Sequence, residues 1–169
     1  MAAFPTHVWT ILLVLQDFSW IAERNNNWDA LSVGAYGLVV AFLESLFVFA
    51  IALLISFLIP RKWSSKKRIA ILSTLMMICG IWAILTQLYF LLGYSVPDSL
   101  LKFFISRSHP LRAVYGVCAL LVTPTVIIPI YGLFESEKAL QATLNVIERL
   151  SLLTTLYLLA DLGSLIIVL

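Results

Sequence analysis

Charged residues are scarce in this chain. Asp, Glu, Lys and Arg supply only 12% of its 169 residues, whereas a soluble domain contains about 25%. Apolar residues supply 62%. Because so few polar side chains cannot cover a folded surface in water, we expect lipid to cover it instead. The scarcity of charge therefore argues against an ordinary soluble protein and indicates an integral membrane protein.

Histidine and cysteine are equally scarce, with two of each. We expect His7 and His109 near the membrane boundaries on opposite faces, so they cannot share a haem. We expect Cys79 and Cys118 at different depths, too far apart for a disulfide. The chain also lacks HExxH, GxSxG, a P-loop and a metal-spaced Cys/His cluster. We therefore expect no metal, no cofactor and no catalytic residue.

Long polar segments are lacking as well. None of the stretches between the apolar runs reaches the roughly 50 residues that a separate soluble domain needs. The net charge of +2 gives no reason to expect nucleic acid as a partner. The first six residues contain no Lys or Arg, so we expect the first apolar run to be a retained helix rather than a signal peptide.

What the chain does contain is long hydrophobic runs, which predict an all-α, polytopic transmembrane bundle in a single membrane domain. The predicted spans are residues 5–22, 30–59, 69–94, 113–134 and 150–169. There are five spans, or four if the first segment re-enters the membrane or lies in its interface. The polar stretch 135–149 can extend the last span into one long helix.

A shorter helix is expected between the third and fourth spans. Pro97 and Asp98 are typical of a helix start, and the apolar residues that follow alternate with Lys102 and Arg107. One interpretation is a short helix lying in the membrane interface. The alternative is an amphipathic loop packed on the bundle.

The basic residues indicate orientation. Five of them lie between the second and third spans: Arg61, Lys62, Lys66, Lys67 and Arg68. Because basic loops favour the cytoplasmic side, we interpret this cluster as a cytoplasmic anchor at the plasma membrane. With five spans the N-terminus is then cytoplasmic and the C-terminus is outside, whereas four spans place the N-terminus outside.

Four polar residues inside the hydrophobic segments form the candidate intramembrane site: Asp17, Glu44, Gln87 and Asp161. Each lies on or beside a stripe of small or polar residues with helical spacing. The stripes are His7, Thr10, Asp17 and Arg24 in the first segment; Gly34, Gly37, Ala41, Ser45, Ala52 and Ser56 in the second; Ser73, Gly80 and Gln87 in the third; and Thr154, Tyr157, Asp161 and Ser164 in the fifth. We expect these faces to meet inside the bundle.

No Lys or Arg lies deep in a segment, so the carboxylates are expected to lack a cationic partner in this chain. One interpretation is structural: a neutral Glu44 donates a hydrogen bond to Ser45, Gln87 or a backbone carbonyl. The other is a proton or cation site, or a docking point for a basic residue on another subunit.

Pro124 and Pro129 lie inside the fourth segment. Each removes a backbone donor and leaves one carbonyl free, that of Leu120 and that of Thr125. Free carbonyls in broken helices can line ion sites. A simple kink is the favoured interpretation.

Three functions compete. The first is a non-catalytic accessory, scaffold or assembly subunit of a larger membrane complex, whose partners are the lipid bilayer and other membrane subunits or further copies of this chain. The second is a small oligomeric proton- or cation-coupled transporter or channel. An intramembrane lipid-modifying enzyme is the least favoured, because its site needs several polar groups near one interface.

Overall fold

The computed structural model describes residue 1, residues 3–60 and residues 62–169, and these residues are all-α, with no strand among them. The helices are α1 (Ala3–Arg24), α2 (Asn27–Leu58), α3 (Ser65–Leu91), α4 (Asp98–Ile105), α5 (Pro110–Glu135) and α6 (Glu137–Val168). Four of the described helices, α2, α3, α5 and α6, are long and apolar enough to cross a membrane. The prediction of an all-α fold with long apolar helices is therefore confirmed, and these helices are consistent with membrane integration.

α2 and α3 begin earlier than the predicted spans because capping side chains, and not hydropathy, determine where these helices start. The Asn26 side chain accepts a hydrogen bond of 2.8 Å from the Asp29 amide, so α2 begins at Asn27 instead of residue 30. The Ser64 hydroxyl accepts from the Lys67 amide in the same way at the start of α3. Gly93, with φ of 70°, turns the chain just after α3.

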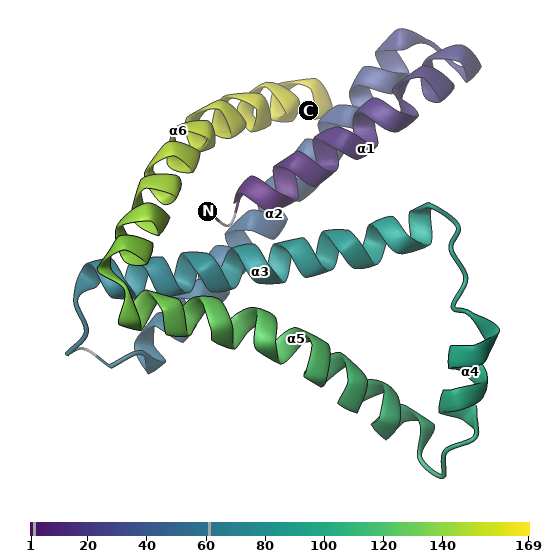
Figure 1. The fold of residues 1–169 in the computed structure, drawn as a ribbon. Helices are drawn as coiled ribbons and strands as arrows, with labels where there is room; N and C mark the ends of the chain where they lie inside the picture. Colours follow the sequence, from purple (N-terminus) through teal and green to yellow (C-terminus); the bar gives the residue numbers. More distant parts are fainter. Residues whose placement is uncertain (2, 61) are drawn as a thin grey trace.

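The last two long helices were only partly predicted. The polar stretch before residue 150 is helical and joins the last span, so α6 is one helix of 32 residues, as the sequence allowed. Ser136 caps it by accepting from the Ala139 amide. α5 runs through Pro124 and Pro129 as one helix (Figure 1), which agrees with a local distortion and not with a helix broken in two.

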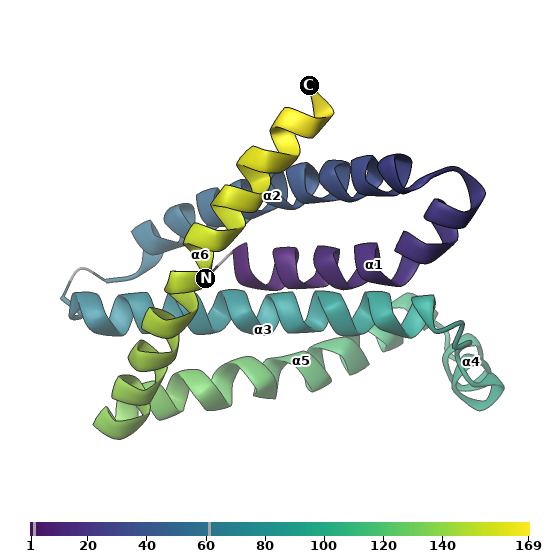
Figure 2. The same cartoon turned by 90° about the horizontal axis from the view of Figure 1, so that it is seen from above.

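α1 packs closely between α2 and α3 (Figure 2). A Cβ added at Gly34 of α2 would lie 3.0 Å from Val14, and one added at Gly37 would lie 3.2 Å from Thr10. One added at Gly80 of α3 would lie only 2.7 Å from the Pro5 ring. The small-residue stripes of both helices therefore bring their backbones close to α1, as expected.

The contact between Pro5 and Gly80 also gives the position of α1 along the bundle. Gly80 lies 15 residues beyond Ser65, or about 22 Å along the helix axis, so α1 begins beside the middle of α3. A full first span from residue 5 would instead begin level with the basic loop. α1 therefore begins well away from the basic loop.

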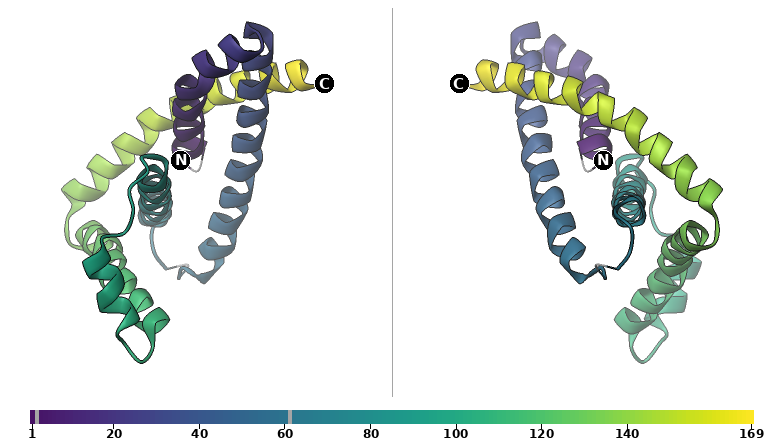
Figure 3. Two further views of the ribbon diagram at one scale, coloured as in Figure 1. Left: turned by 90° about the vertical axis from the view of Figure 1, so that its right-hand side faces the viewer. Right: turned by 90° about the vertical axis from the view of Figure 1, so that its left-hand side faces the viewer.

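A second packing centre lies where α3, α5 and α6 meet. Ala70, Ile71, Leu133 and Leu140 are buried there, with Trp63, Ile130 and Leu144 packed against them. From this end α6 crosses obliquely over α3, α1 and α2 (Figures 2 and 3).

α3 and α5 diverge from this centre toward α4, which joins their far ends (Figure 1). The predicted short helix between the third and fourth spans is therefore present, as α4. It contains no buried residue and among the other described helices it contacts α5.

Candidate functional site

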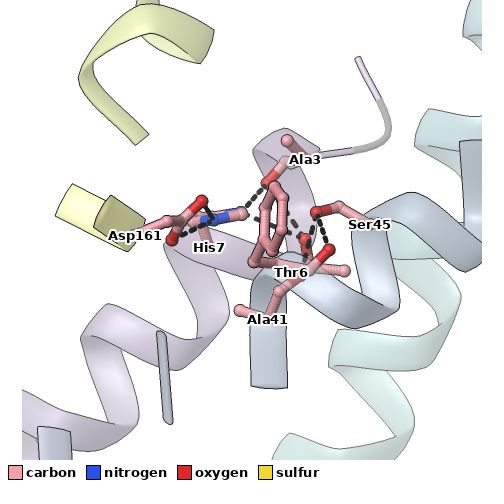
Figure 4. Close-up of polar contacts among 7 residues, drawn as sticks. Ala3, Thr6, His7, Ala41, Ser45 and Asp161 are labelled. Atoms are coloured by element: carbon pink, nitrogen blue, oxygen red, sulfur yellow. Dashed lines mark hydrogen bonds and ion pairs between the residues drawn. The ribbon is translucent and has the colours of Figure 1, made fainter. Parts of the chain in front are cut away.

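A buried histidine–aspartate pair joins the two ends of the chain. His7 Nε2 of α1 lies 3.0 Å from Oδ1 and 3.0 Å from Oδ2 of Asp161 in α6. His7 is 1% exposed and Asp161 is 6% exposed. Figure 4 shows the imidazole between the Asp161 carboxylate and the Ala3 carbonyl. The pair therefore holds α1 against α6.

The partners of the imidazole define how many protons the pair holds. Nδ1 lies 2.8 Å from the Ala3 carbonyl oxygen, which can only accept, so Nδ1 carries a proton. Nε2 faces two carboxylate oxygens, so one further proton lies between Nε2 and the carboxyl group. The pair then holds two protons and has no net charge, whichever partner keeps the shared one. Neutrality is what a buried ion pair in an apolar bundle requires.

Polar and aromatic groups of three helices surround this pair. Tyr157 of α6 stacks on the imidazole, with ring centroids 4.8 Å apart and planes inclined by 20°. His7, Ser45, Tyr157 and Asp161 line one cavity of about 270 Å³. Ser164, the next member of the predicted stripe in α6, is buried as well. The polar face of the last helix therefore points into the bundle, as predicted.

The pair corrects two sequence-based expectations. Asp161 does have a partner in this chain, because His7 serves where no Lys or Arg is present. His7 is also a buried partner of Asp161, and this pairing was not predicted from the sequence. The pairing was missed because it depends on α1 beginning beside the middle of α3, which brings His7 next to Asp161. The sequence feature that pointed toward this pairing was the position of His7 on the polar stripe of the first segment.

The other three candidate residues meet elsewhere, on the opposite side of α1. A cavity of about 640 Å³ between α1, α2 and α3 is lined by Glu44, Gln87 and Trp9. An adjoining cavity of about 380 Å³ is lined by the same three residues and by Asp17. Asp17, Glu44 and Gln87 therefore converge as expected, whereas Asp161 lies apart from them with His7.

Glu44 does not form the hydrogen bonds expected of a structural carboxyl. The Ser45 hydroxyl donates instead to the carbonyls of Ala41, at 2.9 Å, and Phe42, at 3.0 Å. Within the described part of the chain, neither a hydrogen bond nor an ion pair joins Glu44 to another group. Its exposed side chain lines both cavities, so it is available to a ligand or a partner.

Two described members of the basic cluster, Lys67 and Arg68, pack against neighbouring helices. Arg68 donates to the Ser56 carbonyl at 3.2 Å and to its hydroxyl at 3.1 Å, which ties the start of α3 to the end of α2. Lys67 Nζ lies 5.8 Å from the centre of the Phe134 ring. Lys62 and Lys66 are exposed. Arg61 lies outside the described residues.

Around Pro124 and Pro129, the nearest polar contact joins α5 to α3. The Trp82 indole nitrogen donates to the Thr125 hydroxyl at 3.0 Å, and that hydroxyl donates to the Val122 carbonyl at 2.7 Å.

No group of three His, Cys, Asp or Glu side chains in the described residues is placed to hold a metal ion. Cys79 and Cys118 are both free. Neither a protein-family model, nor a curated protein, nor a solved structure matches this chain.

Proposed function

We propose that this protein is a small, non-catalytic integral membrane subunit that serves as a scaffold or assembly partner for other membrane helices. The observation that carries the proposal is the divergence of α5 from the rest of the bundle. Leu133, near its C-terminal end, is the only buried residue of α5 among those described. Among the described residues, the rest of this helix therefore keeps its side chains at least partly uncovered by its own chain.

Polar groups on the diverging helix support a protein partner over lipid alone. The Trp82–Thr125 hydrogen bond lies on an exposed surface near the middle of α3 and α5. Pro124 and Pro129 also withhold their amide donors from the carbonyls of Leu120 and Thr125. Lipid tails offer these two carbonyls no donor, whereas an adjoining helix can cover both them and the exposed hydrogen bond.

The membrane placement belongs to the same proposal. The exposed Lys62 and Lys66 favour a cytoplasmic position for the α2–α3 loop. α3 and α5 then carry α4 to the opposite face, where its apolar side chains lie in the interface and Asp98 faces water. α1 lies in the membrane on the side of that outer face without crossing it. The protein then has four spans, and the turn at residues 25–26 lies outside.

Site-specific photocrosslinking tests the proposal. A photoreactive benzoylphenylalanine replaces Leu120 of α5, which is 75% exposed, and the cells that make the protein are irradiated before extraction. We expect a covalent adduct with another membrane polypeptide or a second copy of this chain. Leu54 of α2, which is 66% exposed, is the control position for the same photoreactive replacement. Adducts with lipid alone at position 120 would contradict the proposal.

Proton- or cation-coupled transport is the second candidate, and the His7–Asp161 pair favours it. A neutral pair that shares one proton between α1 and α6 can couple proton movement to a change in helix packing. Flux in proteoliposomes tests this function with Glu44→Gln and Asp161→Asn, and with Asp98→Asn of α4 as the control. Unchanged flux in both intramembrane variants would remove the two carboxylates from any transport mechanism.

A further inference from the structure

The cavity between α1, α2 and α3 combines apolar walls with negative charge. Leu43, Phe47, Val48, Met76 and Ile84 supply much of its lining. Its acidic group is Glu44, and Asp17 lines the adjoining cavity. Neither lining contains a Lys, Arg or His among the described residues. The charge of a ligand that complements this lining is therefore positive.

Aromatic and amide groups add to that preference. Trp9 lines both cavities together with Glu44 and Gln87, and the face of an indole ring attracts a cation that has lost its water. The Gln87 amide oxygen can accept a hydrogen bond from an ammonium group. A cationic centre beside Glu44 thus meets a carboxylate, an aromatic ring and an amide at one place.

The size of the cavity favours a small molecule over a whole helix. A volume of about 640 Å³ lies in the range of roughly 300–1,000 Å³ that small-molecule sites occupy. Three helices of this chain already surround it, and Pro5 of α1 closes onto Gly80 of α3 at one end. Leu43 and Phe47 are 58% and 68% exposed, so the cavity opens toward the bilayer between α2 and α3.

We propose that this cavity binds a hydrophobic cation, such as a lipophilic amine or a quaternary onium ion, with the positive centre beside Glu44 and the apolar groups against Phe47, Met76 and Ile84. The ligand enters laterally from the membrane. This inference goes beyond assembly with other helices, since it concerns a different face of the chain from the diverging surface of α5.

The two cysteines provide the test without any added label. Cys79 lines the cavity, whereas Cys118 lies on α5 and is absent from the lining. The purified protein in lipid nanodiscs is alkylated with N-ethylmaleimide, with and without tetraphenylphosphonium, and modification of each cysteine is followed by mass spectrometry. A ligand at ten times its dissociation constant should slow alkylation of Cys79 about tenfold. The rate at Cys118 should not change.

Two comparisons decide the outcome. Tetraphenylborate has the same shape and the opposite charge, so we expect it to leave Cys79 unprotected. Glu44→Gln should weaken protection by tetraphenylphosphonium about tenfold, because a charge-assisted contact is lost. Equal protection by both ions, or none by tetraphenylphosphonium, would overturn the proposal. The comparison of the two ions uses the unaltered protein, so it decides the matter even if the variant fails to fold.

The result is separable from that of the assembly proposal. Protection of Cys79 in a protein that shows no polypeptide adduct at position 120 would support the cation site alone. A crosslink between Cys79 and another chain on treatment with a bismaleimide, with no protection of Cys79 by either ion, would assign the cavity to a partner helix and overturn the cation proposal.

Discussion

His7 and Asp161 are separated by 154 residues of sequence, yet Nε2 of one lies 3.0 Å from both carboxylate oxygens of the other. Their contact joins α1 to the oblique helix α6. Because the pair is buried and neutral as a unit, it can hold these helices together inside an apolar bundle. It also keeps α1 in place as a wall of the cavity that contains Glu44.

Replacement of either member of the pair should destabilise the fold. His7→Ala and Asp161→Ala each leave a buried polar group without its partner, at a cost of about 1–3 kcal/mol. Asp161→Asn should cost less, since its amide can donate to Nε2 of a neutral His7 whose Nδ1 still donates to Ala3. Thermal unfolding in detergent, followed by tryptophan fluorescence, measures the series.

The double variant His7→Ala/Asp161→Ala supplies the control for this prediction. Because each single change already breaks the pair, the double loss of stability should be smaller than the sum of the two single losses. Additive losses would show that the two residues act independently.

The approach of Pro5 to Gly80 makes a second prediction. Gly80→Ala would place a methyl group 2.7 Å from a rigid ring, so α1 must shift away from α3. We expect a loss of about 1–3 kcal/mol, as in other overpacked contacts. Gly116→Ala in α5 meets no atom within 4 Å and should be neutral or slightly stabilising. Equal effects in the same unfolding experiment would argue against the close approach.

A third prediction concerns the loop between α2 and α3. Arg68→Met keeps much of the apolar stem but removes both hydrogen bonds to Ser56, and should destabilise the hairpin by about 1–2 kcal/mol. Lys66→Met, at an exposed position, is the matched variant and should have little effect. The denaturation midpoint of the two variants in mixed micelles distinguishes these outcomes.

Much of the fold could be predicted because long apolar runs and helical stripes depend on local sequence. Gly34, Gly37 and Gly80 are examples, since their spacing predicted the faces on which α2 and α3 approach another helix. Helix starts were less predictable because they depend on single capping side chains. Asn26 and Ser64 moved α2 and α3 to earlier starts than the apolar runs indicated.

The candidate site was predicted only in part, because contacts between distant segments depend on how far one helix is displaced along another. The convergence of Asp17, Glu44 and Gln87 followed from their helical faces. The pairing of His7 with Asp161 did not, because it depends on α1 beginning beside Gly80. Nothing in the local sequence around His7 indicates that displacement.

The membrane orientation makes a fourth prediction. In a background with Cys79→Ser and Cys118→Ser, a cysteine at position 26 or 108 should react in intact cells with a maleimide that cannot cross membranes. A cysteine at position 64 or 136 should react only after the membrane is opened. Positions 26 and 108 on opposite sides of the membrane would contradict the four-span arrangement.

Native mass spectrometry of the protein, extracted in mild detergent from the cells that make it, tests the assembly proposal most directly. We expect the chain to appear in a complex of defined mass with another membrane polypeptide or with further copies of itself. Leu120→Arg should dissociate that complex, since it places a charge on the diverging surface of α5, while Leu54→Arg on α2 leaves the complex assembled. A solitary chain that retains lipid alone, in the unaltered protein, would contradict the account.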